Sequence, residues 1–236
     1  MPGRAPPRPY ICDQQDQPPL QGAPGLILAS DTAGQPSPKA VIFDIGNVLY
    51  DWDPRYLYAK LIPDRSELNW FLTHVVTKDW HFQHDAGRSS ADTIAELRAA
   101  FPAYGTLIDA YVPRWLETIP GPMPGMIALV ETLAADRVPL FSITNFSAEF
   151  WPRFRAAAPV FERFRGIVVS GVERITKPDP SIYALALARF GPDAEHAVFI
   201  DDRADNVDAA IAAGLRGHVF VDAATTRRFL HHQGLL

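Results

Sequence analysis

Residues 40–47 read AVIFDIGN, a short apolar run that ends in an acid and a glycine. The same form, a few apolar and often β-branched residues closed by a polar one, recurs four times along the chain. The five runs are Ala40–Asp44, Val138–Thr144, Gly166–Ser170, Ala197–Asp201 and Gly217–Asp222. Continuous apolar runs of this length are typical of strands that are buried on both faces of a sheet.

Amphipathic stretches between these runs predict helices, among them Gly125–Asp136, Pro180–Phe190 and Asn206–Ala213. Strands that alternate with helices predict an α/β fold with a Rossmann-like parallel sheet. Open sheets of this kind bind ligands beyond the carboxyl ends of their strands. The polar residues that close the five runs are therefore the first candidates for function.

The gap between the first two runs is too long for a single crossover helix. Within it the pattern predicts helices at Pro54–Leu61, Ser66–Val76, Ser89–Ala100 and Leu107–Leu116. Residues 80–88, WHFQHDAGR, are predicted as a loop that faces the strand ends. We therefore expect a Rossmann-like core of residues 39–52 and 118–236, with a helical cap of residues 53–117 inserted over the strand ends.

Residues 1–38 differ in composition from this body, because they contain nine of the 22 prolines. Proline removes a backbone donor and fixes φ, so we expect a disordered tail. The chain has a single cysteine, Cys12, which lies in this tail. One cysteine excludes an intrachain disulfide, and this fits a cytoplasmic protein.

The composition also bounds the partners of the chain. The net charge of −5 argues against a nucleic-acid binder, since such proteins usually carry a basic excess. No apolar run approaches the roughly 20 residues of a membrane-spanning helix, which argues against a membrane protein. We expect a monomer or a homodimer.

Four polar stations close or follow the predicted strands, in the order acid, hydroxyl, lysine and acidic pair. They are Asp44, then Thr144 with Asn145, then Lys177 ahead of a proline, and finally Asp201 with Asp202. Each alone has an ordinary structural explanation, such as a turn or a helix cap. All four in this order resemble the motifs of the haloacid dehalogenase-like hydrolase superfamily, and the resemblance covers residues 39 to about 222.

The resemblance implies a phosphatase mechanism. Asp44 would attack phosphorus and form an aspartyl phosphate, while Thr144 and Asn145 bind phosphate oxygens and Lys177 stabilises the transition state. Mg²⁺ is the implied cofactor, since a hard divalent cation lets two anions approach. The implied metal ligands are Asp44, the carbonyl of Gly46, Asp202, and Asp201 through water or a hydrogen bond.

One position departs from the superfamily pattern. Most of its phosphatases place a second Asp, the general acid and base, two residues after the nucleophile, where this chain has Gly46. The Asp-x-Gly-Asn form resembles a subgroup of subclass IA, with a helical C1 cap, that includes an α-glucose-1-phosphate phosphatase. Water or a cap residue would then supply the proton, and His84 is a candidate donor, with Asp85 and Arg88 contacting the substrate.

The sequence therefore predicts Mg²⁺-dependent hydrolysis of a small phosphorylated metabolite, a phosphomonoester. Two alternatives stay open. A metal-free 2-haloacid dehalogenase would also use Asp44, and it tolerates Gly46, but the pair Asp201 and Asp202 would repel its substrate. A non-catalytic phosphate-binding regulatory domain would equally explain the missing acid at Gly46.

Overall fold

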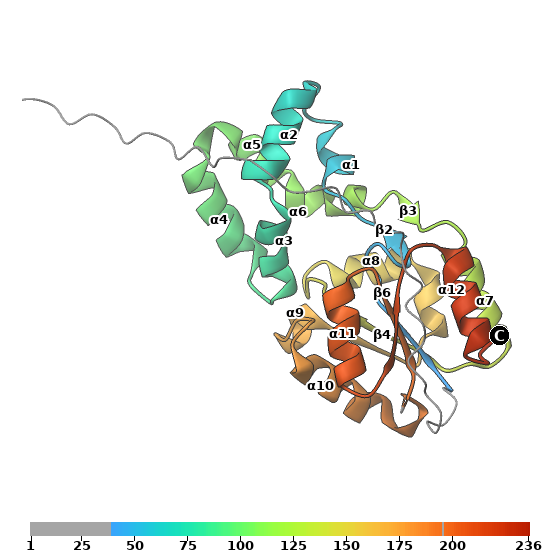
Figure 1. Cartoon of the computed structure of the whole chain (residues 1–236). Coiled ribbons are helices and arrows are strands. Elements are labelled where there is room, and N and C mark those ends of the chain that lie inside the picture. The colour runs from blue at the N-terminus through green and yellow to red at the C-terminus, as the bar shows by residue number, and fades with distance from the viewer. Residues whose placement is uncertain (1–38, 195) are drawn as a thin grey trace, which may run out of the picture. The chain divides into compact units, whose positions relative to one another are not determined.

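The computed structural model describes residues 39–194 and 196–236, so the predicted tail with Cys12 lies outside the described residues. A five-stranded sheet lies at its centre, in the order β5-β4-β1-β6-β7, and every neighbouring pair of strands is parallel (Figure 1). The strands are β1 Val41–Phe43, β4 Leu140–Thr144, β5 Gly166–Val169, β6 Val198–Asp201 and β7 Arg216–Val219. The predicted Rossmann-like α/β fold is confirmed.

The strand register brings the polar strand ends to one edge of the sheet. Phe43, the last residue of β1, pairs with Ser142 of β4 on one side and with Ile200 of β6 on the other. Asp44 follows β1 directly, and β4 and β6 end one or two residues beyond these pairs. The three central strands therefore finish close together.

Helices cover both faces of the sheet. Alternate residues of a strand point to opposite faces, and here both sets are apolar, so both faces must be buried. Val41 and Phe43 share one buried cluster with residues of α7 (Met126–Ala135) and α12 (Ala223–His232). Ile42 lies in a second cluster with α10 (Pro180–Phe190) and α11 (Ala204–Ala212). Burial of each such side chain stabilises the fold by about 1.5–3 kcal/mol, so packing on both faces stabilises the sheet.

The long gap between β1 and β4 is mostly helical, as predicted. A short antiparallel ribbon of β2 (Tyr50–Asp51) and β3 (Gly121–Pro122) brackets it, so the chain leaves and returns at neighbouring points. The helices are α1 Arg55–Tyr58, α2 Arg65–His74, α3 Lys78–Asp85, α4 Ser90–Ala100, α5 Gly105–Asp109 and α6 Tyr111–Arg114. The division into a cap and a core at residues 53 and 117 stays a prediction.

Helix α3 corrects the prediction of a loop over residues 80–88. The hydroxyl of Thr77 accepts a hydrogen bond from the backbone N–H of Trp80, which caps the helix, and Asp79 lies in the first turn, where an acid is favoured. The helix ends before Gly87, whose φ of +91° suits glycine. The cap signal at Thr77 was present in the sequence, and the many aromatic residues concealed the helical period.

Other differences are smaller. The predicted helix Leu107–Leu116 is broken into α5, α6 and a 3₁₀ turn, η2 (Trp115–Thr118), because Pro113 has no N–H to bond the carbonyl of Asp109. Three helices were not predicted: α8 (Trp151–Ala157), α9 (Ser170–Glu173) and α12. Further 3₁₀ turns are η1 Pro102–Tyr104, η3 Pro159–Arg163 and η4 Gly191–Ala194. Over the residues that the structure describes, no helix is both long and apolar enough to span a membrane.

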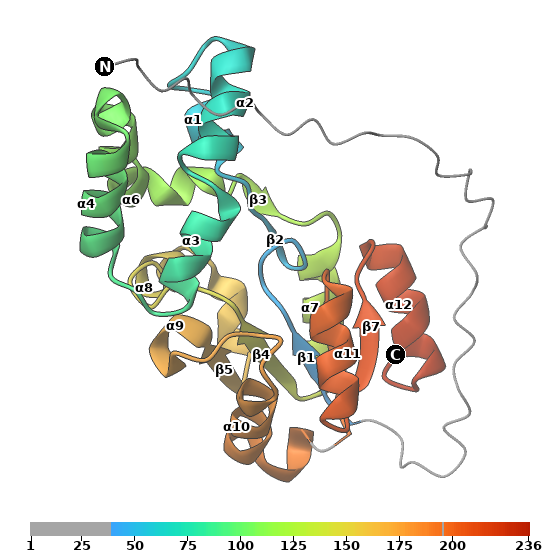
Figure 2. The ribbon, with the colours of Figure 1, turned by 60° about the vertical axis from the view of Figure 1, so that its left-hand side comes forward.

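One buried hydroxyl joins three segments that are distant in sequence. Ser170, which follows β5, donates to the carbonyl of Asp85 at the end of α3 (2.6 Å) and accepts from the N–H of Phe146 after β4 (2.9 Å). Its exposed fraction is zero. Helices α3 and α9 lie side by side at this joint (Figure 2).

We expect Ser170→Ala to lower the free energy of unfolding by about 1–3 kcal/mol, because two buried backbone groups lose their partner. Urea unfolding followed by far-UV circular dichroism measures the change. Ser181→Ala, at an exposed position on α10, is the matched control and should change stability by less than about 0.5 kcal/mol. Equal stability of the two variants would contradict the structural role given to Ser170.

Candidate active site

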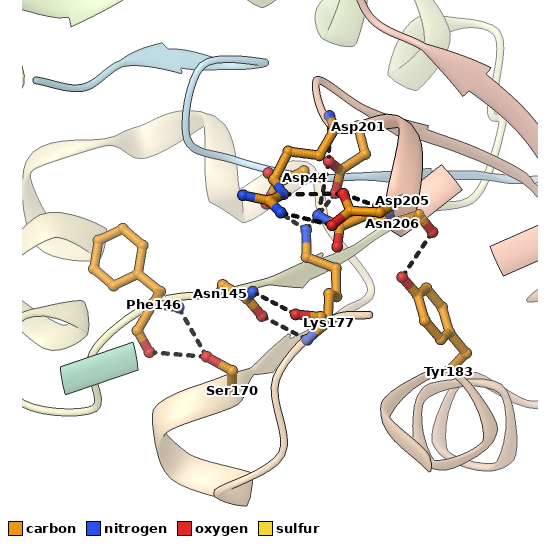
Figure 3. Close-up of polar contacts among 10 residues, drawn as sticks. Asp44, Asn145, Phe146, Ser170, Lys177, Tyr183, Asp201, Asp205 and Asn206 are labelled. Atoms are coloured by element: carbon orange, nitrogen blue, oxygen red, sulfur yellow. Dashed lines mark hydrogen bonds and ion pairs between the residues drawn. The ribbon is translucent and has the colours of Figure 1, made fainter. Parts of the chain in front are cut away.

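The buried ammonium group of Lys177 joins two strand ends. Its Nζ lies 2.9 Å from Oδ1 of Asp44 after β1 and 2.6 Å from Oδ2 of Asp201 at the end of β6 (Figure 3). The side chains of Lys177 and Asp201 are completely buried, and that of Asp44 is 11% exposed. Three of the four predicted stations thus meet in one ion-pair network.

Asn145 holds the backbone of Lys177 in place. Its Nδ2 donates to the carbonyl of Lys177 (3.0 Å), and its Oδ1 accepts from the N–H of the same residue (2.8 Å). Both polar atoms of the amide are therefore used in positioning the lysine (Figure 3). The predicted place of Asn145 in the phosphate site stays a prediction. The structure shows this anchoring function and puts Asn145 in the wall of the adjacent cavity.

Asp201 is also fully engaged. Besides Lys177, it accepts hydrogen bonds at Oδ1 from the N–H of Arg203 (2.9 Å) and from Nδ2 of Asn206 (3.0 Å). The next residue, Asp202, is exposed and lines the cavity. Oxygens of Asp44, Asp201 and Asp202 all lie within 4.8 Å of one another.

The charges in this cluster do not balance. Burial, opposed by Lys177 and reinforced by Asp201, raises the pKa of Asp44 from 3.8 to about 7. Burial and the charge of Asp201 also raise the pKa of Asp202. Burial lowers the pKa of Lys177, but the two carboxylates outweigh it and the net shift is upward. Three carboxyls around one ammonium fit a hard divalent cation, which prefers oxygen ligands.

The turn after β1 carries Gly46 and Asn47. Asn47 adopts a left-handed conformation with φ of +56°, and its Oδ1 accepts from the N–H of Trp52 (3.1 Å), which fixes the turn. Gly46 lines the cavity, and a Cβ built there would meet no atom within 4 Å. Space therefore exists at Gly46 for a larger side chain.

Thr144 is completely buried at the end of β4. Its hydroxyl has no hydrogen-bond partner among the residues that the structure describes, and the side chain does not line the cavity. An unpartnered buried hydroxyl is unusual and normally has an explanation such as an absent ligand.

His84 and Arg88, the predicted cap contacts, lie away from the cavity. His84 is buried, its Nε2 lies 2.6 Å from the hydroxyl of Thr93, and burial lowers its pKa to about 4. Arg88 is exposed and bonds Glu96 and Gln83. The helical period explains both placements: α3 turns one face to the cavity, and that face carries His81 and Asp85 at a spacing of four residues.

A cavity of about 430 Å³ opens beside the ion-pair network. The charged residues beside the strand ends are Asp44, Lys177, Asp202 and Arg203, and α3 adds Lys78, Asp79 and Asp85. The remaining wall of the cavity is largely aromatic and was not predicted, because it is assembled from segments distant in sequence. The wall includes Tyr50, Trp52, Phe82, Trp115, Phe146 and Phe154.

Comparisons with known proteins identify the family. A model of the haloacid dehalogenase-like hydrolase family matches residues 38–214. Sesquiterpene phosphatase astK of Aspergillus oryzae is 28% identical over 189 residues, which are 80% of this chain and 92% of that protein. Phosphoglycolate phosphatase of Yersinia pestis is 28% identical over 132 residues, and this chain spans about half (54%) of its length and matches over 56% of its own.

Solved structures share the fold. A HAD family enzyme of Bacteroides thetaiotaomicron, in complex with magnesium and inorganic phosphate, aligns with a TM-score of 0.63 at 19% identity. The alignment covers 79% of this chain and 96% of that one. At this identity the likeness supports the fold alone.

We expect Lys177→Met to destabilise the protein by about 3–5 kcal/mol at pH 8, because it leaves buried carboxylates without their cation. The folded pKa of Asp44, about 7, lies above its usual 3.8, so stability falls as the pH rises between these values. Without Lys177 this pKa moves higher still, and the loss of stability continues above pH 7. Urea unfolding at pH 5 and pH 8 measures the difference.

Lys60→Met is the control, since the exposed pair of Lys60 with Glu117 is worth at most about 1 kcal/mol. A Lys177 variant that loses no more stability than this control would show that the buried pair does not hold the site together.

Proposed function

The chain belongs to the haloacid dehalogenase-like hydrolases, and we propose that it hydrolyses phosphomonoesters with Mg²⁺ through an aspartyl phosphate on Asp44. The observation that carries the proposal is the strand-end carboxylate of Asp44, held by buried Lys177 inside a cluster of three carboxyls. The names of the two relatives, both phosphatases, support phosphate ester hydrolysis. Membership of subclass IA and of the Asp-x-Gly-Asn subgroup is part of this proposal.

The ion pair orients the nucleophile. Lys177 binds Oδ1 of Asp44, which leaves Oδ2 for attack on phosphorus. The same ammonium charge opposes the negative charge that develops on the phosphoryl oxygens. A hydrogen bond from the buried hydroxyl of Thr144 to one of these oxygens stays a prediction, since this side chain does not line the cavity.

The metal ligands would come from the same edge of the sheet. We assign Asp44, Asp202 and the carbonyl of Gly46 as ligands, with Asp201 behind them. A bound Mg²⁺ would neutralise charge and so allow the phosphate and the carboxylate to approach. The grouping of the three carboxyls supports this assignment, because their oxygens lie within 4.8 Å of one another with a single buried ammonium beside them.

The dehalogenase alternative is less consistent with the charges. A 2-haloacid carries its own carboxylate, and three carboxyls within 4.8 Å would repel it unless a cation were bound. A regulatory domain without turnover is the remaining alternative, and steady phosphate release would eliminate it.

We expect Asp44→Asn to abolish phosphate release, since an amide does not form the phosphoenzyme. Steady-state release of inorganic phosphate, with Mg²⁺ and with a chelator, measures the loss and the metal requirement. Borohydride added during turnover should reduce the aspartyl phosphate and leave a mass change on the peptide that contains residue 44. Asp208→Asn, an exposed position on α11, is the control and should keep full activity.

Full activity of Asp44→Asn would rule out Asp44 as the nucleophile. Activity that survives the chelator, with halide released from a 2-haloacid, would favour the dehalogenase instead.

A further inference from the structure

The cavity beside Asp44 has two chemically different parts. One part holds the charged groups that the proposed reaction uses. The other is dominated by aromatic and aliphatic side chains, with a few polar groups of α3 among them. Of the apolar side chains, Trp52 and Ile119 are partly exposed and Trp115 and Phe146 are almost completely buried. A phosphate would occupy the first part, so the alcohol that it esterifies must lie against the second.

The second part offers little to a polyhydroxylated alcohol. A sugar needs several hydrogen-bond donors and acceptors, because each buried hydroxyl without a partner is unfavourable. The polar groups of this part, the indole nitrogens of Trp52 and Trp115 and the exposed Lys78 and Asp79 of α3, are few and stand among aromatic rings. They could bind one or two hydroxyls but not the full set of a sugar. Lys78 lies over the ring of Trp52, with Nζ 5.9 Å from the ring centroid.

We infer that the substrate is the phosphate monoester of an apolar alcohol, which binds with its hydrocarbon part against this aromatic wall. The inference rests on the proposed phosphatase function and narrows its substrate class. The volume of about 430 Å³ suits a small-molecule ligand, and predominantly apolar walls are usual for such sites. The apolar alcohol also distinguishes this chain from a sugar-phosphate phosphatase, which the sequence motif alone would suggest.

The test is a series of straight-chain alkyl phosphates from ethyl to octyl, with α-glucose 1-phosphate as the polar comparison. We expect kcat/KM to rise by about fourfold for each added methylene until the cavity is filled, which corresponds to about 0.8 kcal/mol per buried CH₂. Trp52→Ala and Ile119→Ala should each flatten this dependence. Trp70→Ala, which removes an exposed Trp of α2 outside the cavity, should leave it unchanged.

An efficiency that does not depend on chain length, or that is highest for glucose 1-phosphate, would overturn the inference while leaving phosphatase activity intact. Failure of the wild-type protein to hydrolyse every ester would instead overturn the proposed function.

A second observation concerns the proton that an alkyl alcohol needs in order to leave. Asp85, on the face of α3 that lines the cavity, is 7% exposed. Its Oδ1 has no hydrogen-bond partner in the described part of the chain, although Nε2 of His81 lies 3.5 Å away. Nδ1 of that histidine lies 2.6 Å from the hydroxyl of Tyr111, so the ring is fixed.

The surroundings favour the protonated form of Asp85. Burial and the charge of Asp44 raise its pKa well above 3.8, against smaller opposing effects of the Ser147 N–H and of Lys177. Burial also lowers the pKa of His81, so the imidazole beside the acid is neutral. A neutral carboxylic acid that faces the cavity can donate a proton, which Gly46 cannot.

We also infer that Asp85 is the general acid and base of the proposed reaction, in place of the missing acid at Gly46. When Asp44 attacks phosphorus, the bond from phosphorus to the alcohol oxygen breaks, and that oxygen takes the proton of Asp85. The Asp85 carboxylate then accepts a proton from water as the water oxygen attacks the aspartyl phosphate. Phosphate leaves, and both carboxyls return to their starting states.

Asp85→Asn keeps the shape of the side chain and removes its proton. With octyl phosphate we expect turnover to fall by about 10²–10⁴-fold, the usual contribution of general acid–base catalysis. With p-nitrophenyl phosphate the leaving group needs no proton, so rapid mixing should still show a burst of about one equivalent of nitrophenol, followed by slow turnover. Asp92→Asn, an exposed acid on α4, should behave as wild type.

A merely structural role for Asp85 would slow the burst and the octyl ester equally, and that result would overturn the inference. Unchanged turnover of octyl phosphate by Asp85→Asn would overturn it as well. Adding Gly46→Asp to Asp85→Asn places a carboxyl in the open space beside Asp44, and we expect it to restore part of the turnover. A double variant as slow as the single one contradicts the proposal, whereas no turnover by the wild type contradicts the phosphatase function itself.

Discussion

The contact on which the rest of the site depends is the buried ammonium of Lys177 between Asp44 and Asp201. Two carboxylates this close would repel each other in a buried site, and each would lose the solvation that water provides. The lysine makes their approach possible, and Asn145 fixes the lysine through its own backbone. The nucleophile, its orientation and the surplus of negative charge that fits a cation all follow from this arrangement.

Much of this arrangement could be predicted from the sequence. The apolar runs identify the strands, parallel strands finish at one edge, and the residues after them must then lie near one another. Asp44, Lys177 and Asp201 meet as this reasoning requires. Each of these polar residues stands within or next to a short recognisable segment of sequence, so a single sequence is enough to identify them.

The remainder depends on contacts that no local pattern records. The aromatic wall joins Trp52, Trp115 and Phe146, which come from three separate segments. The anchoring bonds of Asn145 depend on the path of a loop 32 residues further on. The sequence predicts His84 and Arg88 on a loop as contacts of the cap with substrate. In the structure His84 belongs to helix α3 and Arg88 follows it, both lie outside the cavity wall, and Asp85 lines it.

The position of Asp85 ties proton transfer to the packing of α3. An acid at Gly46 would move with the strand that carries Asp44, whereas Asp85 belongs to a helix held by the hydroxyl of Ser170. The same helix supplies Phe82 to the aromatic wall. Any substitution that shifts α3 would therefore alter the position of the proton donor and the aromatic wall together.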